Sequence, residues 1–196
     1  QLKTNYKLFD TYYEYDDIDI SIFHKEIDKL DNIAVNIAEI GYEIRKCYFK
    51  GEIFQFKFLP KNKLNLPPID VKVYFDSKED FYWSVKKVIK TPNNKIFHKA
   101  NKIILSNWYW NSNIVHIDKF PLNLIFKSLT WYLPKNIIEP IQFDNINKMN
   151  IPIDIERHLS HHFGNWKEIK NDWKSYRDDK AIIHCHPDVF LNKKKF

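Results

Sequence analysis

Glycine and cysteine are scarce in this sequence. Of its 196 residues three are glycine, at positions 41, 51 and 164, and none of them forms a Gly-x-Gly arrangement. A glycine-rich loop that wraps phosphate groups is therefore excluded within this chain. The two cysteines, Cys47 and Cys185, form no Cys-x-x-Cys pair, so the sequence indicates no disulfide framework. A reducing compartment is the simpler expectation.

Long apolar runs are also absent from the sequence. None approaches the roughly 20 residues that a membrane-spanning helix needs, and no secretory signal is visible. The chain starts at Gln1 and not at Met, so we expect it to begin inside a longer product. We expect a cytoplasmic protein, and peripheral association with the inner face of the membrane stays open.

The sequence does contain enough apolar residues for a packed core, together with an excess of positive charge. Hydrophobic residues make up 44% and aromatic residues 16% of the chain, so disorder is not expected for most of it. The net charge of +6 suits an anionic ligand, an acidic polymer or a membrane surface. We expect no nucleic-acid partner, and the oligomeric state is not indicated.

Two segments of the first half share an alternating pattern with aspartate on one face. In residues 15–23, Ile18, Ile20 and Ile22 alternate with Asp17, Asp19 and Ser21. In residues 69–75, Ile69, Val71, Val73 and Phe75 alternate with Asp70, Lys72 and Tyr74. Successive side chains of a strand point to opposite faces, so both segments are predicted strands with an apolar face and an acidic face.

Between these strands the pattern predicts a helix and a hairpin. Residues 24–40 carry apolar side chains at helical spacing, and Gly41 is placed to end the helix. The runs 42–49 and 52–59 are strand-like, and the Lys50-Gly51 pair that joins them indicates a hairpin turn.

The second half of the chain is predicted to be mostly helical. Ser77, followed by acidic residues, is placed to cap a helix running towards Val88. Further helices are expected at residues 94–105 and at residues 154–162, the latter ended by Gly164. The predicted fold class is therefore α+β, with a short mixed sheet and its helices followed by a mostly helical half.

The run Trp108-Tyr109-Trp110 is aromatic and is preceded by Lys102. We expect its side chains to lie in the core. Stacking on bases or sugars is the alternative interpretation.

Asp17, Asp19 and Asp70 are the strongest candidates for a functional site. Two aspartates at positions i and i+2 of a strand lie on one face, roughly 6–7 Å apart, and an aspartate on a neighbouring strand completes a cup of oxygen ligands. Mg²⁺ prefers such ligands and leaves the rest of its shell to water and substrate phosphates. We expect all three aspartates to bind Mg²⁺ or Mn²⁺ at a site that transfers a phosphate-bearing group.

The order of strand, helix, hairpin and strand is that of the nucleotidyltransferase fold. Within that superfamily, residues 16–20 (Asp-Asp-Ile-Asp-Ile) resemble the signature of the LicD/fukutin group of phosphotransferases. Residues 68–71 (Pro-Ile-Asp-Val) resemble the strand that supplies its third carboxylate, and residues 149–166 are similar to the ending of the group. The Gly-Thr-containing loop of the family has no counterpart in residues 1–15. Either it precedes Gln1 or it is lost, and in the second case the donor phosphates need another cradle.

The resemblance implies a metal-dependent transferase that moves a phosphate-linked group, such as phosphocholine or a polyol phosphate, from a CDP-linked donor to a surface glycan or lipid-linked glycan. Asp17 and Asp19 would be the paired metal ligands. Asp70 would be a third ligand or the base that takes the hydroxyl proton of the acceptor. The resemblance also implies a single nucleotidyltransferase-like domain over residues 1–196, with a catalytic core at about residues 10–90 and a helical part at about residues 91–196.

Two other functions stay open. One is a nucleotidyltransferase that attaches NMP to a small molecule, protein or RNA. The other is a catalytically silent relative that binds a glycan or a nucleotide. A Gly-Thr loop in the residues that precede Gln1 would favour an active transferase over the silent relative.

Histidines gather near the end of the chain, where five of the eight lie between His158 and His186. A zinc site formed by these residues and Cys185 is one interpretation. Packing beside the turn at Gly164 is the simpler one. A nucleophilic cysteine is not favoured, because no orienting residue can be named.

Overall fold

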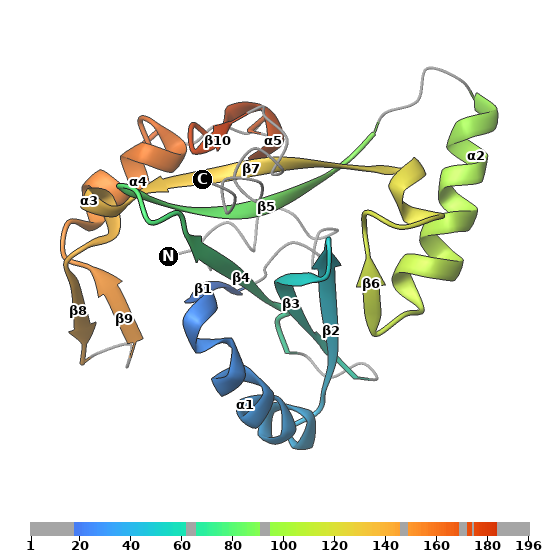
Figure 1. Cartoon of the computed structure of the whole chain (residues 1–196), viewed down its shortest axis with the longest axis horizontal. Coiled ribbons are helices and arrows are strands. Elements are labelled where there is room, and N and C mark those ends of the chain that lie inside the picture. Colours follow the sequence, from blue (N-terminus) through green and yellow to red (C-terminus); the bar gives the residue numbers. More distant parts are fainter. Residues whose placement is uncertain are drawn as a thin grey trace. The chain divides into compact units, whose positions relative to one another are not determined.

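The computed structural model describes residues 18–61, 66–90, 95–145, 149–168, 172–173 and 175–183. The described residues form an α+β protein (Figure 1). The chain divides into two compact units. Unit 1 comprises residues 1–74 and 91–125, and unit 2 comprises residues 75–90 and 126–196.

Unit 1 contains the strands, the helix and the hairpin that the first half of the sequence predicts, followed by further elements. The elements are β1 (Ile18–Phe23), η3 (His24–Glu26), α1 (Ile27–Glu39), β2 (Tyr42–Phe49), β3 (Glu52–Pro60), β4 (Ile69–Asp76), α2 (Lys95–Ile104), η4 (Leu105–Trp110), β6 (Ile114–His116) and η5 (Leu122–Leu124). The strands of its sheet are hydrogen-bonded in the order β6-β2-β3-β4-β1. β1 is parallel to β4 and β6 is parallel to β2, whereas β3 is antiparallel to both of its neighbours. The predicted sequence of strand, helix, hairpin and strand is confirmed.

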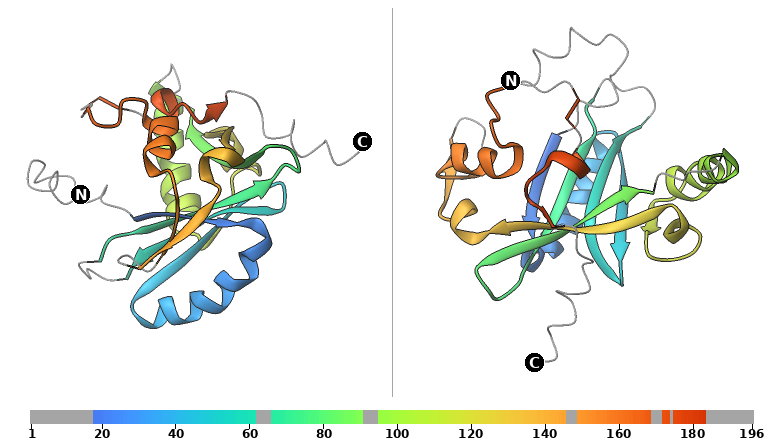
Figure 2. Two further views of the ribbon diagram at one scale, coloured as in Figure 1. Left: turned by 90° about the vertical axis from the view of Figure 1, so that its left-hand side faces the viewer. Right: turned by 90° about the horizontal axis from the view of Figure 1, so that it is seen from above.

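Helix α1 lies along one face of this sheet (Figure 2). Leu30 and Ala34 are the buried residues of α1 and lie one turn apart. The helix therefore packs on the strands through a narrow stripe of apolar side chains. The sheet side of the interface includes Phe56, which is fully buried and has the Lys46 ammonium 5.7 Å above its ring. Gly41, with a φ of +103°, follows the end of the helix as predicted.

The β2–β3 hairpin closes through Lys50 and Gly51, both with positive φ, at 50° and 85°. Two central residues with positive φ are typical of a type I′ turn, whose twist matches that of the flanking strands. A lysine is rarely found in this conformation. The Asp118 carboxylate accepts a hydrogen bond from the Lys50 backbone N–H at 3.0 Å, which helps to hold the turn.

Unit 2 is built on a long antiparallel ribbon. Its elements are β5 (Phe81–Ile89), β7 (Phe126–Pro134), α3 (Lys135–Ile138), β8 (Ile141–Asp144), β9 (Met149–Pro152), α4 (Ile155–Phe163), α5 (Ser175–Asp178) and β10 (Ile182–Ile183). β5 and β7 pair along their whole length, β10 pairs with β7, and β8 and β9 form a separate hairpin. The last residues of β4, Phe75 and Asp76, pair with β5. A small core of Leu129, Trp131, Ala181 and Ile182 lies at β7 and β10.

The predicted helix from Ser77 towards Val88 is wrong, because residues 81–89 form strand β5. The polar residues that suggested a helix cap instead build the turn before this strand. The Ser77 hydroxyl donates to the Phe81 carbonyl at 2.6 Å and accepts from the Glu79 N–H at 3.0 Å. The Asp76 carboxylate accepts from the Lys78 N–H at 2.8 Å. Serine and aspartate satisfy backbone groups equally well in turns and at helix starts, so their presence does not distinguish the two.

A mostly helical second half is also wrong for the described residues, because strands β6 to β10 all lie there. Two of the predicted helices are present. α2 begins at Lys95, and α4 begins after Asp154, whose carboxylate caps it by accepting from the Arg157 N–H at 2.9 Å. Gly164, with a φ of +68°, ends α4 as predicted. No helix among the described residues is both long and apolar enough to cross a membrane.

Candidate functional site

A row of four charged side chains crosses the sheet of unit 1, and we call it the charged row. Asp19 of β1 lies directly opposite Asp70 of β4, Asp70 lies opposite Lys57 of β3, and Lys57 lies opposite Arg45 of β2. Residues that are directly opposite in a sheet share a face. The four side chains therefore emerge on one face, and residues such as Phe56 and Val71, which alternate with them, belong to the face that α1 covers.

Asp70 is held by two neighbours within this face. The Lys57 ammonium is 2.7 Å from each of its carboxylate oxygens, and the Gln55 amide donates to Oδ2 at 2.9 Å. Asp70 and Gln55 are both buried, each with an exposed fraction of 8%. A buried carboxylate needs this kind of compensation, since the loss of its hydration is costly.

Asp19 is more open than Asp70. Its side chain is 57% exposed, and its Oδ1 lies 3.0 Å from the Lys72 ammonium. Lys72 lies opposite both Ser21 and Gln55, in the row next to the charged row on the same face. Each of the two aspartates is thus paired with a lysine, one in a largely buried setting and the other near solvent.

Arg45 ends the charged row and ties it to the second half of unit 1. Its guanidinium donates to the carbonyls of Trp110 at 2.6 Å and Ser112 at 3.0 Å, and lies 5.1 Å from the centre of the Tyr109 ring. The Trp110 carbonyl is the last of η4, where carbonyls have no partner within the helix, and the Ser112 carbonyl lies two residues further on. Arg45 is buried, and its Nη1 has no hydrogen-bond partner among the described residues.

The structure brings together two of the three predicted site residues. Asp19 and Asp70 are neighbours on one face, as the two alternating patterns predict. Asp17 lies outside the described residues. Among the residues that are described, no cluster of three or more His, Cys, Asp or Glu side chains is arranged to hold a metal ion.

The sequence interpretation did not include Lys57, Gln55 or Arg45 in the site. A signal for two of them exists, because Gln55 and Lys57 alternate with Phe54, Phe56 and Phe58 and so must lie on the polar face. Alternation does not reveal which residue of the next strand lies opposite, because that depends on register. The partnership of Lys57 with Asp70 is therefore visible only in the structure.

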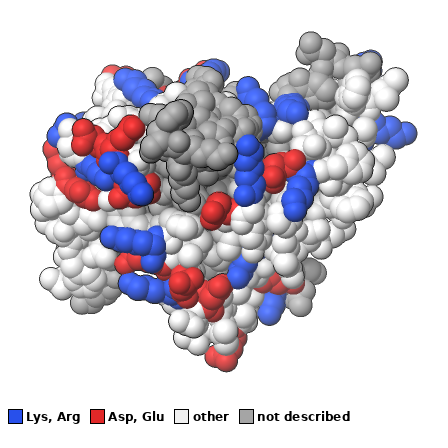
Figure 3. Space-filling view, viewed as in Figure 1, with Lys and Arg blue, Asp and Glu red and all other residues white. Residues whose placement is uncertain are grey.

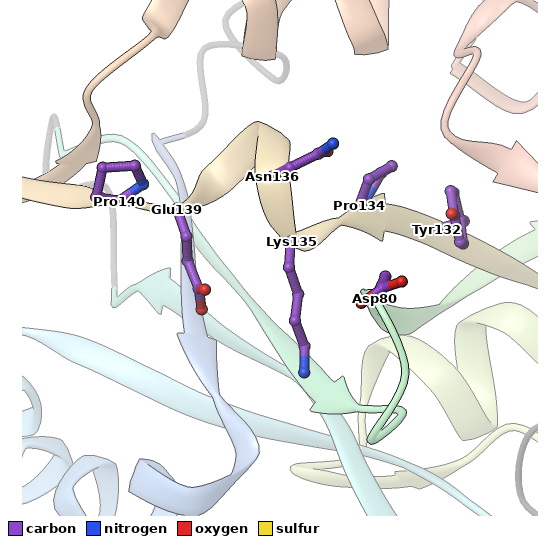
Figure 4. A pocket seen from close by; sticks show the side chains of 7 residues that line it. All are labelled: Asp80, Tyr132, Pro134, Lys135, Asn136, Glu139 and Pro140. Atoms are coloured by element: carbon purple, nitrogen blue, oxygen red, sulfur yellow. The ribbon is translucent and has the colours of Figure 1, made fainter.

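A separate hollow of about 800 Å³ lies in unit 2 (Figure 4). Its lining residues are Asp80, Tyr132, Pro134, Lys135, Asn136, Glu139 and Pro140. Lys135 and Glu139 extend in the same direction from the segment after β7 (Figure 4). Lys135 is 2.8 Å from Asp76, and Glu139 accepts a 2.5 Å hydrogen bond from the Tyr82 hydroxyl. Burial, and then this hydrogen bond to Glu139, raise the pKa of the Tyr82 phenol. Two of the charged lining groups are thus held by partners within unit 2.

A buried aspartate in unit 2, Asp179, contacts His162 of α4, whose ring lies beside those of His158 and His161. Asp179 lies 3.1 Å from His162 Nδ1, and it accepts from the Trp131 indole at 2.8 Å and from the Ala181 N–H at 2.9 Å. His158 and His162 have ring centres 5.0 Å apart. His184, Cys185 and His186, which the zinc interpretation also used, lie outside the described residues.

The environment of His158 predicts a pH dependence of stability. Burial, and then the charges of His162 and His161, lower the pKa of His158 from 6.5 to about 4. Between these values the unfolded chain binds a proton that the folded chain does not, so stability rises with pH in this interval and falls as the pH drops towards 4. Between pH 4 and 6.5, we expect His158→Gln to lower the slope of the free energy of unfolding against pH. The decrease corresponds to the uptake on unfolding of up to about one proton fewer.

Urea unfolding of both proteins at several pH values measures this effect. His98→Gln, a change of an exposed histidine in unit 1, is the matched control and should leave the slope unchanged. An equal slope in wild type and His158→Gln would contradict the prediction.

Comparisons with protein-family models, curated proteins and solved structures found no match to this chain. The interpretation of the site therefore depends on its own residues and contacts.

Proposed function

We propose that unit 1 is the catalytic part of a metal-dependent transferase of the LicD/fukutin type, with a nucleotidyltransferase-like arrangement of its strands. It would move a phosphate-linked group from a CDP-linked donor to a glycan or lipid-linked glycan. The observation that carries the proposal is the pairing of Asp19 and Asp70 at facing positions of two parallel strands, in the predicted order of elements.

The two aspartates provide the kind of ligand that a hard cation needs. Carboxylate oxygens suit Mg²⁺ or Mn²⁺, and neighbouring strands lie about 4.8 Å apart, close enough for two side chains to reach one ion. Asp17 is the third ligand in this proposal. A bound divalent cation would neutralise charge on the donor phosphates as the phosphate-linked group is transferred.

The lysines of this face suit the anionic part of such a donor. Lys57 and Lys72 each pair with a carboxylate, and each carries its ammonium group at the end of a flexible four-carbon stem. A lysine that leaves its carboxylate for a phosphate oxygen frees that carboxylate for a cation. Together Asp19, Asp70, Lys57, Lys72 and Arg45 carry two negative and three positive charges, so the face favours a ligand with phosphate groups.

The ion pair between Lys57 and Asp70 favours a second candidate function. With both carboxylate oxygens at 2.7 Å from one ammonium, Asp70 is already neutralised within the fold. A closed charge pair of this kind suits a catalytically silent relative that binds a glycan or nucleotide. The two functions differ in whether a divalent cation promotes nucleotide binding.

Thermal melting with nucleotides tests the proposed function. We expect CDP together with Mg²⁺ to raise the melting temperature more than either alone, because the cation needs donor phosphates to complete its shell. At about a hundred times the dissociation constant, the stabilisation reaches about 2.7 kcal/mol. GDP and UDP, each with and without Mg²⁺, test the base preference.

Three variants locate the effect. Asp19→Asn should abolish the joint stabilisation. Asp70→Asn should abolish it if Asp70 is mainly a ligand, and should leave part of it if Asp70 is mainly the base. Asp31→Asn is the matched control. Asp31 also pairs with a lysine, Lys46, but it belongs to α1 and lies outside the charged row. If no nucleotide shifts the wild-type melt in the presence of metal, the transferase proposal fails and the silent relative takes its place.

A further inference from the structure

The longest stretch of the chain without a negative charge contains a helix on the surface of unit 1. No aspartate or glutamate occurs between Asp80 and Asp118, whereas this interval holds six lysines. Three of them, Lys95, Lys99 and Lys102, lie on α2 at spacings of four and three residues and therefore share one face. None of the three forms an ion pair with a carboxylate among the described residues.

The same helix exposes large apolar side chains beside these lysines. Ile96 and Ile103 are seven residues apart, so they lie on one face, and their exposed fractions are 76% and 52%. Phe97 is 61% exposed. None of the ten residues of α2 is buried, and Ala100, Asn101 and Ile104 are half-buried. Within the described part of the chain, the helix therefore turns only a narrow stripe towards its neighbours and leaves most of its apolar side chains exposed.

The helical turn η4, which continues α2, extends this surface with two tryptophans. The expectation that residues 108–110 belong to the core is wrong for both of them, because Trp108 and Trp110 are 54% and 57% exposed. Tyr109 between them is buried and lies beside the Arg45 guanidinium. These contacts fasten η4 to the sheet of unit 1 and leave the tryptophans outside.

The charge pattern distinguishes this surface from other exposed apolar side chains. Helix α1 also exposes Val35 and Ile33, but it carries Asp28, Asp31 and Glu39. At the right of Figure 3, where α2 lies, the described surface is blue or white and shows no red. A surface that combines lysines, aliphatic side chains and tryptophan is complementary to the boundary between lipid headgroups and acyl chains.

We propose that α2 and η4 form an interfacial helix that binds the surface of an anionic membrane. The apolar side chains of Ile96, Phe97, Ile103, Trp108 and Trp110 would enter the headgroup region. Lys95, Lys99 and Lys102 would remain at the level of the anionic headgroups, with their stems along the apolar surface. A nucleic acid would use the lysines but would gain nothing from the exposed isoleucines. This inference does not depend on the proposed transferase activity.

Co-sedimentation of the full chain with lipid vesicles tests the proposal. We expect binding to phosphatidylcholine vesicles that contain phosphatidylglycerol, weaker binding to pure phosphatidylcholine, and loss of the difference at high salt. Replacing Lys95, Lys99 and Lys102 together by Gln should weaken binding to the anionic vesicles about a hundredfold, or about fivefold for each lysine. Ile96→Ser and Ile103→Ser should each weaken it about tenfold.

Two further measurements make the result specific. Tryptophan emission should shift to shorter wavelength on anionic vesicles, and Trp108→Phe with Trp110→Phe should remove that shift. Val35→Ser with Lys29→Gln on α1 is the matched control, because both residues are exposed and belong to a helix with acidic residues. All the substituted side chains are exposed, and circular dichroism checks that each variant is folded.

The proposal is overturned if anionic vesicles are not bound, or if neutral and anionic vesicles bind equally. Equal losses in the α1 control and the α2 variants would also overturn it. So would tighter binding of single-stranded RNA that depends on the lysines and not on Ile96 or Ile103, because the surface would then serve a nucleic acid.

Discussion

Lys57→Met is expected to lower the free energy of unfolding by about 3 kcal/mol, because it leaves the Asp70 carboxylate buried without a cation. Both members of the pair are largely shielded from water, with side chains 19% and 11% exposed. Gln55 still donates one hydrogen bond to Asp70, so we expect the lower end of the range for a broken buried pair. Urea unfolding at neutral pH measures the change.

Two further variants test whether the loss comes from an unpaired buried charge. Lys46→Met removes the partner of Asp31, whose side chain is 58% exposed, and should cost no more than about 1 kcal/mol. Lys57→Met combined with Asp70→Asn should recover much of the loss, because no uncompensated charge remains. A cost below 1 kcal/mol for Lys57→Met alone would show that Asp70 is stabilised without Lys57. The carboxylate would then be open to a metal ion, which favours the transferase over the silent relative.

Asp179→Ala is expected to have a similarly large effect, about 4 kcal/mol. Asp179 is 5% exposed, and its carboxylate accepts hydrogen bonds from His162, the Trp131 indole and the Ala181 N–H. Its removal leaves three buried groups without their acceptor, and each unsatisfied group costs about 1–3 kcal/mol. Urea unfolding followed by circular dichroism measures the loss.

The conservative variant and a surface control separate the acceptor role from other effects. Asp179→Asn keeps one carbonyl oxygen and should cost less than Asp179→Ala. Asp172→Ala removes an aspartate whose side chain is 84% exposed and should change stability by less than about 1 kcal/mol. If Asp179→Ala were as mild as Asp172→Ala, the three donors must find water instead, and the aspartate would not be a structural centre of unit 2.

The first half of the fold could be predicted because each segment has one clear period. The alternation around Asp19 and around Asp70 is compatible only with a strand that has one polar face. The spacing of apolar residues in 24–40 is compatible only with a helix. Gly41 and Gly51 mark the ends of elements by their positive φ, which glycine adopts easily. In these segments local preference and tertiary packing agree.

The prediction failed where the same residues serve two kinds of structure. Ser77 and the acidic residues after it satisfy the backbone of a turn here, whereas they are equally common at the start of a helix. The aromatic and β-branched residues of Phe81–Ile89 were the better signal, since such side chains favour strands. Hydrophobicity alone also placed Trp108 and Trp110 in the core, although both are exposed.

The candidate site was predictable as a face but not as a set of contacts. Alternation assigns Asp19, Asp70 and Lys72 to polar faces, and the order of elements brings β1 beside β4. The pairing of each aspartate with a particular lysine depends on register and on side-chain reach, and neither of these follows from periodicity.

The position of β1 has a consequence for how the site opens. Among the described residues, β1 pairs with β4 alone, and most of its side chains are exposed, including Ile18 at 44% and Ile20 at 38%. Strands with few buried contacts separate locally at a fraction of the global free energy of unfolding. Detachment of this one strand would part Asp19 from Asp70 while β2, β3 and β4 stay paired. The two carboxylates therefore belong to segments of different local stability, and a ligand that bridges them would also slow the hydrogen exchange of the β1 amides.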